Sequence, residues 1–399
     1  MNIIVTGGFE ANFTVGFARG LAANGMELCV ISCDETAARL TAVGIRNVNL
    51  RGSLAENRSS WIKLTNLVSY YARLLWLLFR NRGATIHFTG IFRNHFILWE
   101  GLVLNACFRL LAGKYIYTVH NVLPHSRERS PLFRWIYRRI YQLPHVLLVH
   151  TQRARQQLVE EFGVAEGRIR LTSIGLNEEM PLTSMSPAEA RHRLGFGEQE
   201  QLVLFFGKID EYKGLDLLLA AFDRLNGSSI RLVVAGAFRN QTYRCTILEQ
   251  LSHLKRRNEI CLHERFIPNE EAEVFFKACD VLCLPYRNIY QSGLVFLAPH
   301  FGIPMITTDV GSLREFVESD FGIVTRTNDA AGIADAIESF MAAPTLFSRI
   351  EILHRAQKYR WASVCRDLVP LYAGASSGSS ISRASRKLNQ PDPDAVNLN

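Results

Sequence analysis

The sequence lacks the cysteine patterns of a zinc site or of a small domain held together by disulfides. Its eight cysteines are scattered, without a Cys-x-x-Cys pair or a Cys/His cluster at metal-binding spacing. Cys279 and Cys283 lie four residues apart, but within an apolar run that predicts a buried strand. We therefore predict reduced, mostly buried thiols in a cytoplasmic protein, and no metal site.

Long uninterrupted apolar runs are also missing. Arg73 interrupts the apolar stretch 67–79, and the stretch 96–113 contains Glu100 and Arg109. Neither provides the ~20 apolar residues that a membrane-spanning helix needs, and no secretory signal precedes the first strand pattern. We expect a cytoplasmic protein that is either soluble or peripherally attached to the inner face of the plasma membrane.

Acidic residues are scarce in the first part of the chain. Residues 1–172 carry 21 lysines and arginines against 10 acidic residues, a balance of +11, whereas the remainder carries 24 against 27, a balance of −3. The basic excess predicts an anionic partner, for which a membrane surface, a nucleic acid or a phosphorylated substrate would each serve. No nucleic-acid-binding motif is present, so we predict no nucleic-acid partner.

What the sequence does contain is a regular alternation of short apolar runs and helical patterns. Strands separated by helix-length segments predict an α/β fold with two Rossmann-like, doubly wound parallel-sheet domains facing each other across a cleft. Such folds bind ligands outside the carboxyl ends of their strands. The predicted strands are 2–6, 27–32, 46–50, 85–89, 115–119, 145–149, 169–173, 202–206, 230–235, 259–263, 280–284 and 303–307.

The two predicted domains are separated by a polar, proline-containing segment without a strand pattern. The first domain is predicted over 1–172, the linker over 173–199 and the second domain over 200–345. Helices follow over 346–372. The last segment, 373–399, is polar and of low complexity, which predicts a disordered tail.

The first strand pattern ends in a glycine turn, Gly7-Gly8, as in a dinucleotide-binding unit. That fingerprint needs a third glycine within a few residues, but Phe9–Asn12 supplies none, and the chain has no Tyr-x-x-x-Lys pair of the kind short-chain reductases use. Two interpretations of Gly7 and Gly8 stay open. The turn either exposes backbone N–H groups to a ligand in the cleft or only connects a strand to a helix.

Two lysines mark the start of the second domain. The sequence LVLFFGKIDEYKGLDLLLAAF predicts a buried strand, a loop carrying Lys208 and Lys213, and a helix from about residue 215. Two ammonium groups beside a helix N-terminus suit a diphosphate. A solvated loop with two surface lysines fits the same spacing.

A second candidate site follows the strand predicted at 280–284. The loop leads to Gln291, Ser292 and Gly293, where Ser292 predicts a helix N-cap and the N–H groups around Gly293 would form an anion-binding nest. Plain helix capping explains these residues as well.

In their order and spacing, these segments resemble the GT-B fold glycosyltransferases of the large retaining family usually numbered four. FFGKIDEYKG is similar to the family's phosphate loop, with Lys208 in place of the usual arginine and Lys213 at the family's lysine. FGIPMITTDVGSLREF resembles a family segment that ends in a glutamate, here Glu315. YIYTVHN resembles the strand whose final histidine, here His120, faces the donor sugar. YRWASVCRDLVPLYAG resembles the terminal helix that crosses back to the first domain, so the resemblance covers 1–372.

This resemblance implies an enzyme that moves a sugar from a UDP- or GDP-sugar to an acceptor, with retention and without a metal or other cofactor. It implies catalytic roles for His120, Lys208 and Lys213, the lysines stabilising charge on the departing diphosphate. The residues implied to bind the donor, or to lie beside it, are Gly7, Gly8, Gly207, Gln291, Ser292, Gly293 and Glu315.

The sequence departs from the family in one respect. Members commonly carry two glutamates separated by seven residues across the second candidate site, but no Asp or Glu occurs from 281 to 308. The residue that binds the ribose is therefore unassigned. Two other functions stay open: a non-catalytic, degenerate subunit that binds a sugar nucleotide, and a sugar-nucleotide 2-epimerase, which would need carboxylates in the cleft.

Two segments of the first domain combine basic and aromatic residues. They are 61–82 and 127–141, and the second places Arg134 and Arg138 near Trp135 and Tyr137. Such helices suit the surface of an anionic bilayer, although an amphipathic helix packed on a sheet gives a similar pattern. Membrane docking would fit a lipid-linked or polysaccharide acceptor.

Overall fold

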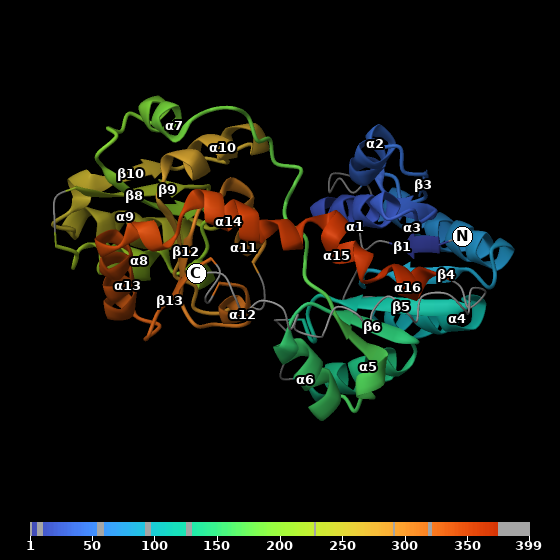
Figure 1. The fold of residues 1–399 in the computed structure, drawn as a ribbon. Helices are drawn as coiled ribbons and strands as arrows, with labels where there is room; N and C mark the ends of the chain where they lie inside the picture. Colours follow the sequence, from blue (N-terminus) through green and yellow to red (C-terminus); the bar gives the residue numbers. More distant parts are fainter. Residues whose placement is uncertain are drawn as a thin grey trace, which may run out of the picture.

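A computed structural model describes residues 2–5, 11–53, 60–91, 97–124, 130–226, 229–289, 292–317 and 321–373. Within these residues the chain forms two parallel sheets, one in each half, with helices on both faces of each sheet (Figure 1). The predicted fold class, two doubly wound α/β domains, is confirmed.

The first sheet has seven strands in the order β3-β2-β1-β4-β5-β6-β7. Strand β1 is buried throughout, with Val5 paired between Ile31 of β2 and Phe88 of β4, because helices cover both faces. All seven strands lie where the sequence predicted them. They are β1 (Asn2–Val5), β2 (Leu28–Ser32), β3 (Asn47–Asn49), β4 (Thr85–Phe88), β5 (Lys114–Val119), β6 (Val146–Val149) and β7 (Ile169–Leu171).

The second sheet has six strands in the order β10-β9-β8-β11-β12-β13. Five were predicted, and β13 was not, because three residues after a glycine are too few to show a strand pattern. The strands are β8 (Gln201–Phe206), β9 (Ile230–Ala235), β10 (Ile260–His263), β11 (Val281–Leu284), β12 (Met305–Thr307) and β13 (Gly322–Val324).

The helices of the first domain fall on two faces because the strand order reverses after β3. Helices α1 and α2 pack in one core cluster, and the helices from α3 to α6 pack in another on the opposite face. Hydroxyl caps start two of them: Ser130 accepts from the Phe133 N–H, and Thr151 accepts from the Ala154 N–H. The helices of the first domain are α1 (Ala11–Ala23), α2 (Asp34–Ala42), α3 (Ser60–Arg80), the π-helix η2 (Leu98–Leu104) that continues into α4 (Asn105–Leu111), α5 (Pro131–Gln142) and α6 (Gln152–Glu160).

The helices of the second domain also form two layers. One layer packs on the face of β8 and β9 that carries Val203 and Val234. It consists of α8 (Leu215–Phe222), α9 (Gln241–His253) and α13 (Ala330–Ala342). The opposite layer consists of α10 (Asn269–Ala278), α11 (Leu294–Leu297), α12 (Leu313–Val317) and α14 (Arg349–Ala356).

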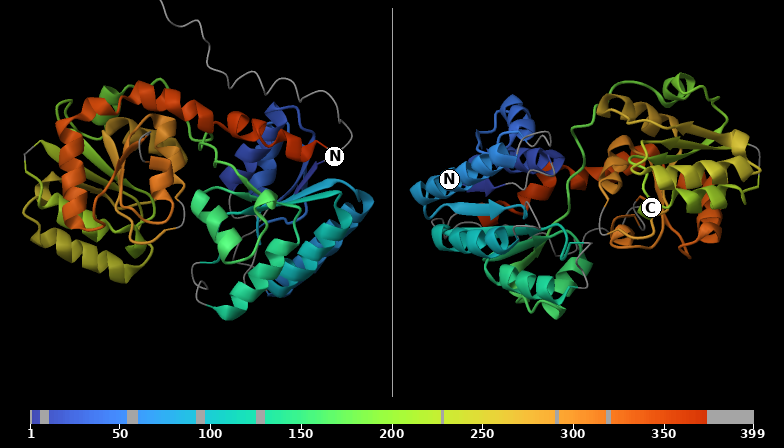
Figure 2. Two further views of the ribbon diagram at one scale, coloured as in Figure 1. Left: turned by 60° about the horizontal axis from the view of Figure 1, so that its bottom comes forward. Right: turned by 180° about the vertical axis from the view of Figure 1, so that it is seen from behind.

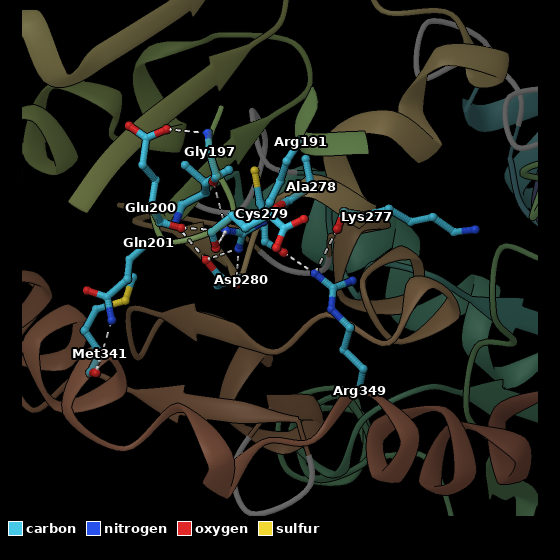
Figure 3. Close-up of polar contacts among 12 residues, drawn as sticks. Arg191, Gly197, Glu200, Gln201, Lys277, Ala278, Cys279, Asp280, Met341 and Arg349 are labelled. Carbon is cyan, nitrogen blue, oxygen red and sulfur yellow. Dashed lines mark hydrogen bonds and ion pairs between the residues drawn. The ribbon is translucent and has the colours of Figure 1, made fainter. Parts of the chain in front are cut away.

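Part of the predicted linker is a helix docked on the second domain. In α7 (Pro187–Arg193), Arg191 makes a bidentate ion pair with Asp280 at 2.7 and 2.8 Å and donates to the carbonyls of Ala278 and Glu200 (Figure 3). Asp280 also accepts from the Leu202 N–H at 2.8 Å. The buried arginine therefore fixes the linker to the ends of β8 and β11 that lie away from their carboxyl edge.

The C-terminal helices return to the first domain. Figure 2 shows this segment, coloured red, running from the second domain across to helix α1. Trp361, the first residue of α15 (Trp361–Arg366), lies 5.3 Å from the Phe13 ring, and the Tyr372 hydroxyl at the end of α16 (Val369–Tyr372) lies 2.7 Å from His87 Nδ1. A Cβ on Gly16 would lie 2.1 Å from the Trp361 indole, so only glycine leaves room for this packing.

Candidate functional site

A cavity of about 420 Å³ lies between the two domains, at the carboxyl edges of both sheets. The first domain contributes Asn12 and Phe13 from the start of α1, and Glu35 from α2. The remaining lining residues are Ala11, Ile174, Gly175, Leu176, Asn177, Ser292, Gly293, Phe296 and Trp361. Two predicted donor-binding residues, Ser292 and Gly293, thus line a cavity that both domains enclose.

Lys213 is buried at the carboxyl edge of the second sheet. It ends a short 3-10 turn (Glu211–Lys213), and its Nζ lies 3.1 Å from the point where a Cβ would sit on Gly207 and 5.9 Å from the centre of the Tyr286 ring. Among the described residues, no carboxylate comes within ion-pair distance of it. Burial lowers the pKa of Lys213 to about 8, against a smaller opposing effect of Asp210.

Gly207 makes room for this lysine. Its φ of 94° lies in a region that side chains rarely adopt, so the chain turns sharply after β8 and leaves space above the ammonium group. Gly214 has φ 70° and begins helix α8 directly after Lys213. The sequence prediction of a strand, a glycine loop and a helix from about 215 is confirmed.

Lys208 differs from Lys213 because it is exposed to solvent on the same loop. The neighbouring Asp210 pairs with Arg239 at 3.0 Å. Spacing alone did not distinguish one buried lysine from one exposed lysine.

A second set of polar contacts connects the lysine loop to the loop after β11. The Arg287 guanidinium donates to Asp216 at 2.6 Å and to the Glu211 carbonyl at 3.1 Å, and the Arg287 N–H donates to the Tyr212 carbonyl at 2.8 Å. Tyr243 adds a hydrogen bond of 2.7 Å to Asp216. Hydrogen bonds therefore join the two segments from which the sequence predicted separate candidate sites.

Helix α11 (Leu294–Leu297) is a single turn, and its N-cap residue is Gly293, one position after the predicted cap Ser292. The Ser292 hydroxyl accepts from the Leu294 N–H at 3.3 Å and lies 3.2 Å from the Tyr286 hydroxyl. Gly293 has ordinary helical angles, and a Cβ added to it would meet no atom of the described residues within 4 Å, its chain neighbours aside. The space beside Gly293 is the cavity itself.

Three histidines of the first domain pack against Phe13 or Phe17 of helix α1, and none of them is among the residues that line the cavity. His120 follows β5 and packs edge-on against Phe13, with 4.6 Å between the ring centres. The centre of the His150 ring lies 5.3 Å from that of His120. Burial lowers the pKa of His120 to about 4, so its imidazole is neutral at physiological pH. His87 in β4 is also neutral, because burial lowers its pKa to about 3, with smaller effects of His120 and His150.

Glu315 contacts the first domain. Its carboxylate accepts from the backbone N–H of Gln152 at 2.7 Å and from that of Arg153 at 3.2 Å, at the start of α6. The Arg153 side chain donates in turn to the Gly311 carbonyl at 3.0 Å. The predicted donor-binding role of Glu315 stays a prediction. Three further predicted residues, Gly7, Gly8 and Gln291, lie outside the described residues.

Sequence reasoning missed several residues that the structure brings to this site. Tyr286 contacts both Lys213 and Ser292, and His150 lies beside His120. Both follow the carboxyl end of a parallel strand, which is the signal that would have found them. Trp361 had no such signal, because it reaches the cavity from the C-terminal helices.

Two family models match the chain and divide it as the structure does. The model described as Glycosyltransferase Family 4 matches residues 11–179, and the model described as Glycosyl transferases group 1 matches residues 187–359. Together they account for more than half of the chain and for both sheets. The chain belongs to these GT-B glycosyltransferases, and it is an enzyme of that class.

Relatives of known name are glycosyltransferases as well. The D-inositol 3-phosphate glycosyltransferase of Corynebacterium aurimucosum is 25% identical over 70% of this chain and 68% of its own length. The enzyme of the same name from Geodermatophilus obscurus is 29% identical over 58% of this chain and 52% of its own length. The chain therefore matches between about half and about two thirds of the length of these two relatives.

Solved structures confirm the fold. A glycosyltransferase from Rickettsia africae has a TM-score of 0.70 at 14% identity, and 93% of this chain is matched to 97% of that one. The Anabaena protein HepE in complex with UDP-glucose has a TM-score of 0.68 at 14% identity, with 93% and 98% covered. At these identities the likeness concerns the fold alone.

Proposed function

We propose that this glycosyltransferase uses a UDP- or GDP-sugar, retains the anomeric configuration and needs no metal ion. Its acceptor is a glycan or a lipid-linked molecule, as in polysaccharide assembly, and the enzyme works in the cytoplasm at the inner face of the plasma membrane. The proposal is carried by the buried ammonium group of Lys213, which has no ion-pair partner among the described residues. A buried charge without a carboxylate partner is costly, and the diphosphate of a nucleotide sugar would neutralise it.

The proposed reaction breaks the bond between the anomeric carbon and the β-phosphate oxygen. The acceptor hydroxyl oxygen forms its bond to the same carbon from the same side, and its proton passes to the departing phosphate. Lys213 and Lys208 stabilise the charge that develops on the diphosphate, which is the task that a metal ion performs in other transferases. Ser292 and Gly293 place the phosphates, and the neutral imidazole of His120 positions a donor or acceptor oxygen.

Anionic groups also suit the acceptor side of the cleft. The first domain carries the +11 balance, and the relatives bear the name D-inositol 3-phosphate glycosyltransferase, which contains a phosphorylated inositol. A lipid-linked acceptor that carries phosphate next to its sugar would satisfy the same electrostatics. The absence of acidic residues from 281 to 308 favours one rival function, a subunit that binds a sugar nucleotide without turning it over.

A two-part experiment tests the proposal. Thermal-shift measurements with UDP, GDP and ADP identify the base, because a ligand that binds only the native state raises its melting temperature. Incubation with the corresponding sugar nucleotides, with and without EDTA, then measures release of free nucleotide. Turnover that survives EDTA supports the proposal, binding without turnover supports the rival function, and no shift with any nucleotide contradicts both.

A further inference from the structure

Three neighbouring helices of the first domain expose an unusual number of large apolar side chains. Helix α3, the continuous helix η2–α4 and helix α5 all belong to the layer on one face of the first sheet. Trp76 is 60% exposed, and Leu110 is 84% exposed. Together these helices expose Val68, Trp76, Phe79, Leu98, Trp99, Val103, Leu110, Leu132 and Trp135, which we call the outer apolar face.

These side chains form one surface because the helices touch one another. Helix α3 packs on α4, and α5 packs on η2. The inner sides of the three helices enter a single core cluster, with Leu74, Leu104 and Ile140 fully buried. Their apolar solvent-facing sides therefore lie next to one another, whereas in an ordinary surface helix that side is polar.

The exposed charged residues that these three helices carry have one sign, although Glu160 and Glu161 at the end of α6 lie beside Trp135. Glu100 is the only acidic residue of the three helices, and it is fully buried, with Tyr71 donating to its carboxylate. The basic residues lie at the surface. The Arg80 guanidinium lies 4.8 Å from the Trp76 ring, and that of Arg139 lies 5.5 Å from the Trp135 ring. Aromatic rings paired with arginines suit the headgroup level of a bilayer.

We infer that the outer apolar face docks on the surface of an anionic lipid bilayer. Its tryptophans, phenylalanine and leucines enter the headgroup boundary while Arg73, Arg80 and Arg109 meet the lipid phosphates. In the part of the chain that the structure describes, no helix has the length and hydropathy needed to cross a bilayer, so the contact is a lateral one. The inference rests on the proposed function in one respect, since a lipid-linked acceptor would lie in the same bilayer.

The structure also changes the surface predicted from the sequence. Helix η2–α4 joins the face and supplies its middle, although the sequence had only excluded it as a membrane span. Tyr137, predicted beside the exposed arginines, is buried, and Arg134 pairs with Glu161 at 2.6 Å. The main contribution of α5 therefore comes from Leu132, Trp135 and Arg139.

Sedimentation with lipid vesicles tests the inference. Wild-type protein should pellet with phosphatidylcholine vesicles that contain phosphatidylglycerol, and much less with pure phosphatidylcholine, at low salt. A variant with Trp76→Ser, Leu98→Ser and Leu110→Ser should bind at least about tenfold more weakly, because each side chain loses its burial in the lipid. The matched control changes the equally exposed Phe266, Leu346 and Ile350 of the second domain to serine and should bind like wild type.

Two further measurements make the outcome decisive. All variants should keep the wild-type thermal shift with UDP or GDP, so a loss of vesicle binding is separable from failure of the proposed function. The inference is overturned if wild type does not pellet with the phosphatidylglycerol vesicles, or if the control loses as much binding as the triple serine variant. A third outcome would also overturn the inference. If wild type does not bind vesicles, and light scattering shows a wild-type dimer that the triple serine variant converts to a monomer, the face binds a second copy of the chain instead.

Discussion

The Glu315 carboxylate of the second domain accepts a hydrogen bond of 2.7 Å from the backbone N–H of Gln152 in the first domain. Gln152 is the first residue of helix α6, where unpaired N–H groups and the helix dipole attract a negative charge. The Arg153 side chain returns a hydrogen bond to Gly311. These contacts connect the domains on the side of the cleft opposite the returning C-terminal helices.

Loss of this contact should open the cleft. Glu315→Ala removes the carboxylate, and Arg153→Ala removes the return hydrogen bond, so each should increase the radius of gyration measured by small-angle scattering without unfolding either domain. Glu351→Ala, which removes an exposed helix-surface pair with Arg355, is the control and should leave the scattering unchanged. Identical curves for all three variants would show that the interdomain hydrogen bonds do not hold the domains together.

The affinity for the nucleoside diphosphate should depend on pH through Lys213. Its pKa of about 8 means that raising the pH above this value removes the ammonium proton in the free enzyme. UDP or GDP affinity should then fall by up to about tenfold for each further pH unit. Calorimetric titrations between neutral and alkaline pH measure this. Lys213→Arg, which stays charged, should bind with no decline in this range, and a wild type equally insensitive to pH would contradict the assignment.

Lys213 should also make the free energy of unfolding rise with pH, although it makes the nucleotide affinity fall. The unfolded chain keeps the Lys213 proton up to its ordinary pKa near ~10.5, whereas the folded chain releases it near 8. The unfolded state therefore binds more protons in this window, and the free energy of unfolding of the ligand-free enzyme should rise with pH. Urea unfolding of Lys213→Met should show a smaller rise.

Gly293 should be required for ligand binding while the fold tolerates its replacement. Gly293→Val adds a side chain at a position that lines the cavity, where its Cβ meets none of the other residues that the structure describes. Nucleotide affinity should therefore fall while the melting temperature stays within a few degrees of wild type. Ser292→Ala is the companion variant. It loses a helix-start hydrogen bond worth about 1 kcal/mol. Unchanged nucleotide affinity in Gly293→Val would leave helix capping as the better explanation of this segment.

The returning C-terminal helix should depend on Gly16. A Cβ at this position would lie 2.1 Å from the Trp361 indole, so Gly16→Ala should lower the free energy of unfolding by at least about 2 kcal/mol through overpacking. Gly167→Ala is the matched control, because nothing lies within 4 Å of its Cβ. Trp361→Ala should reduce the cost of Gly16→Ala in a double-mutant cycle followed by urea unfolding. Additive effects would mean that the indole is not what excludes a side chain there.

The sequence predicted the strands well because buried parallel strands are short, continuous apolar runs between turn residues. It missed β13, which has only three residues, and it assigned α7 to a linker because burial of Arg191 depends on Asp280, far away in the sequence. The candidate site was predicted as segments. That Lys213 is buried and Lys208 exposed depends on how the loop folds beneath Gly207, which spacing does not determine.

The resemblance implied that the C-terminal helix crosses back to the first domain, but the individual residue contacts between the domains could not be predicted. The contact of Glu315 with helix α6 joins residues 163 positions apart. The packing of Trp361 on Gly16 joins residues near opposite ends of the chain. The sequence also did not distinguish Tyr137, which is buried, from Trp135, which is exposed, because both lie between the basic and the apolar residues of α5.

Release of nucleotide from a panel of UDP- and GDP-sugars by wild type and Lys213→Ala tests the central claim most directly. The wild type should release free nucleotide from at least one donor, and Lys213→Ala should stay folded while its turnover falls by roughly a hundredfold or more, because it loses a preorganised charge on the departing diphosphate. Lys208→Ala should act in the same direction, and Lys208→Arg should be tolerated. A folded Lys213→Ala enzyme with near-normal turnover of every accepted donor would contradict the account.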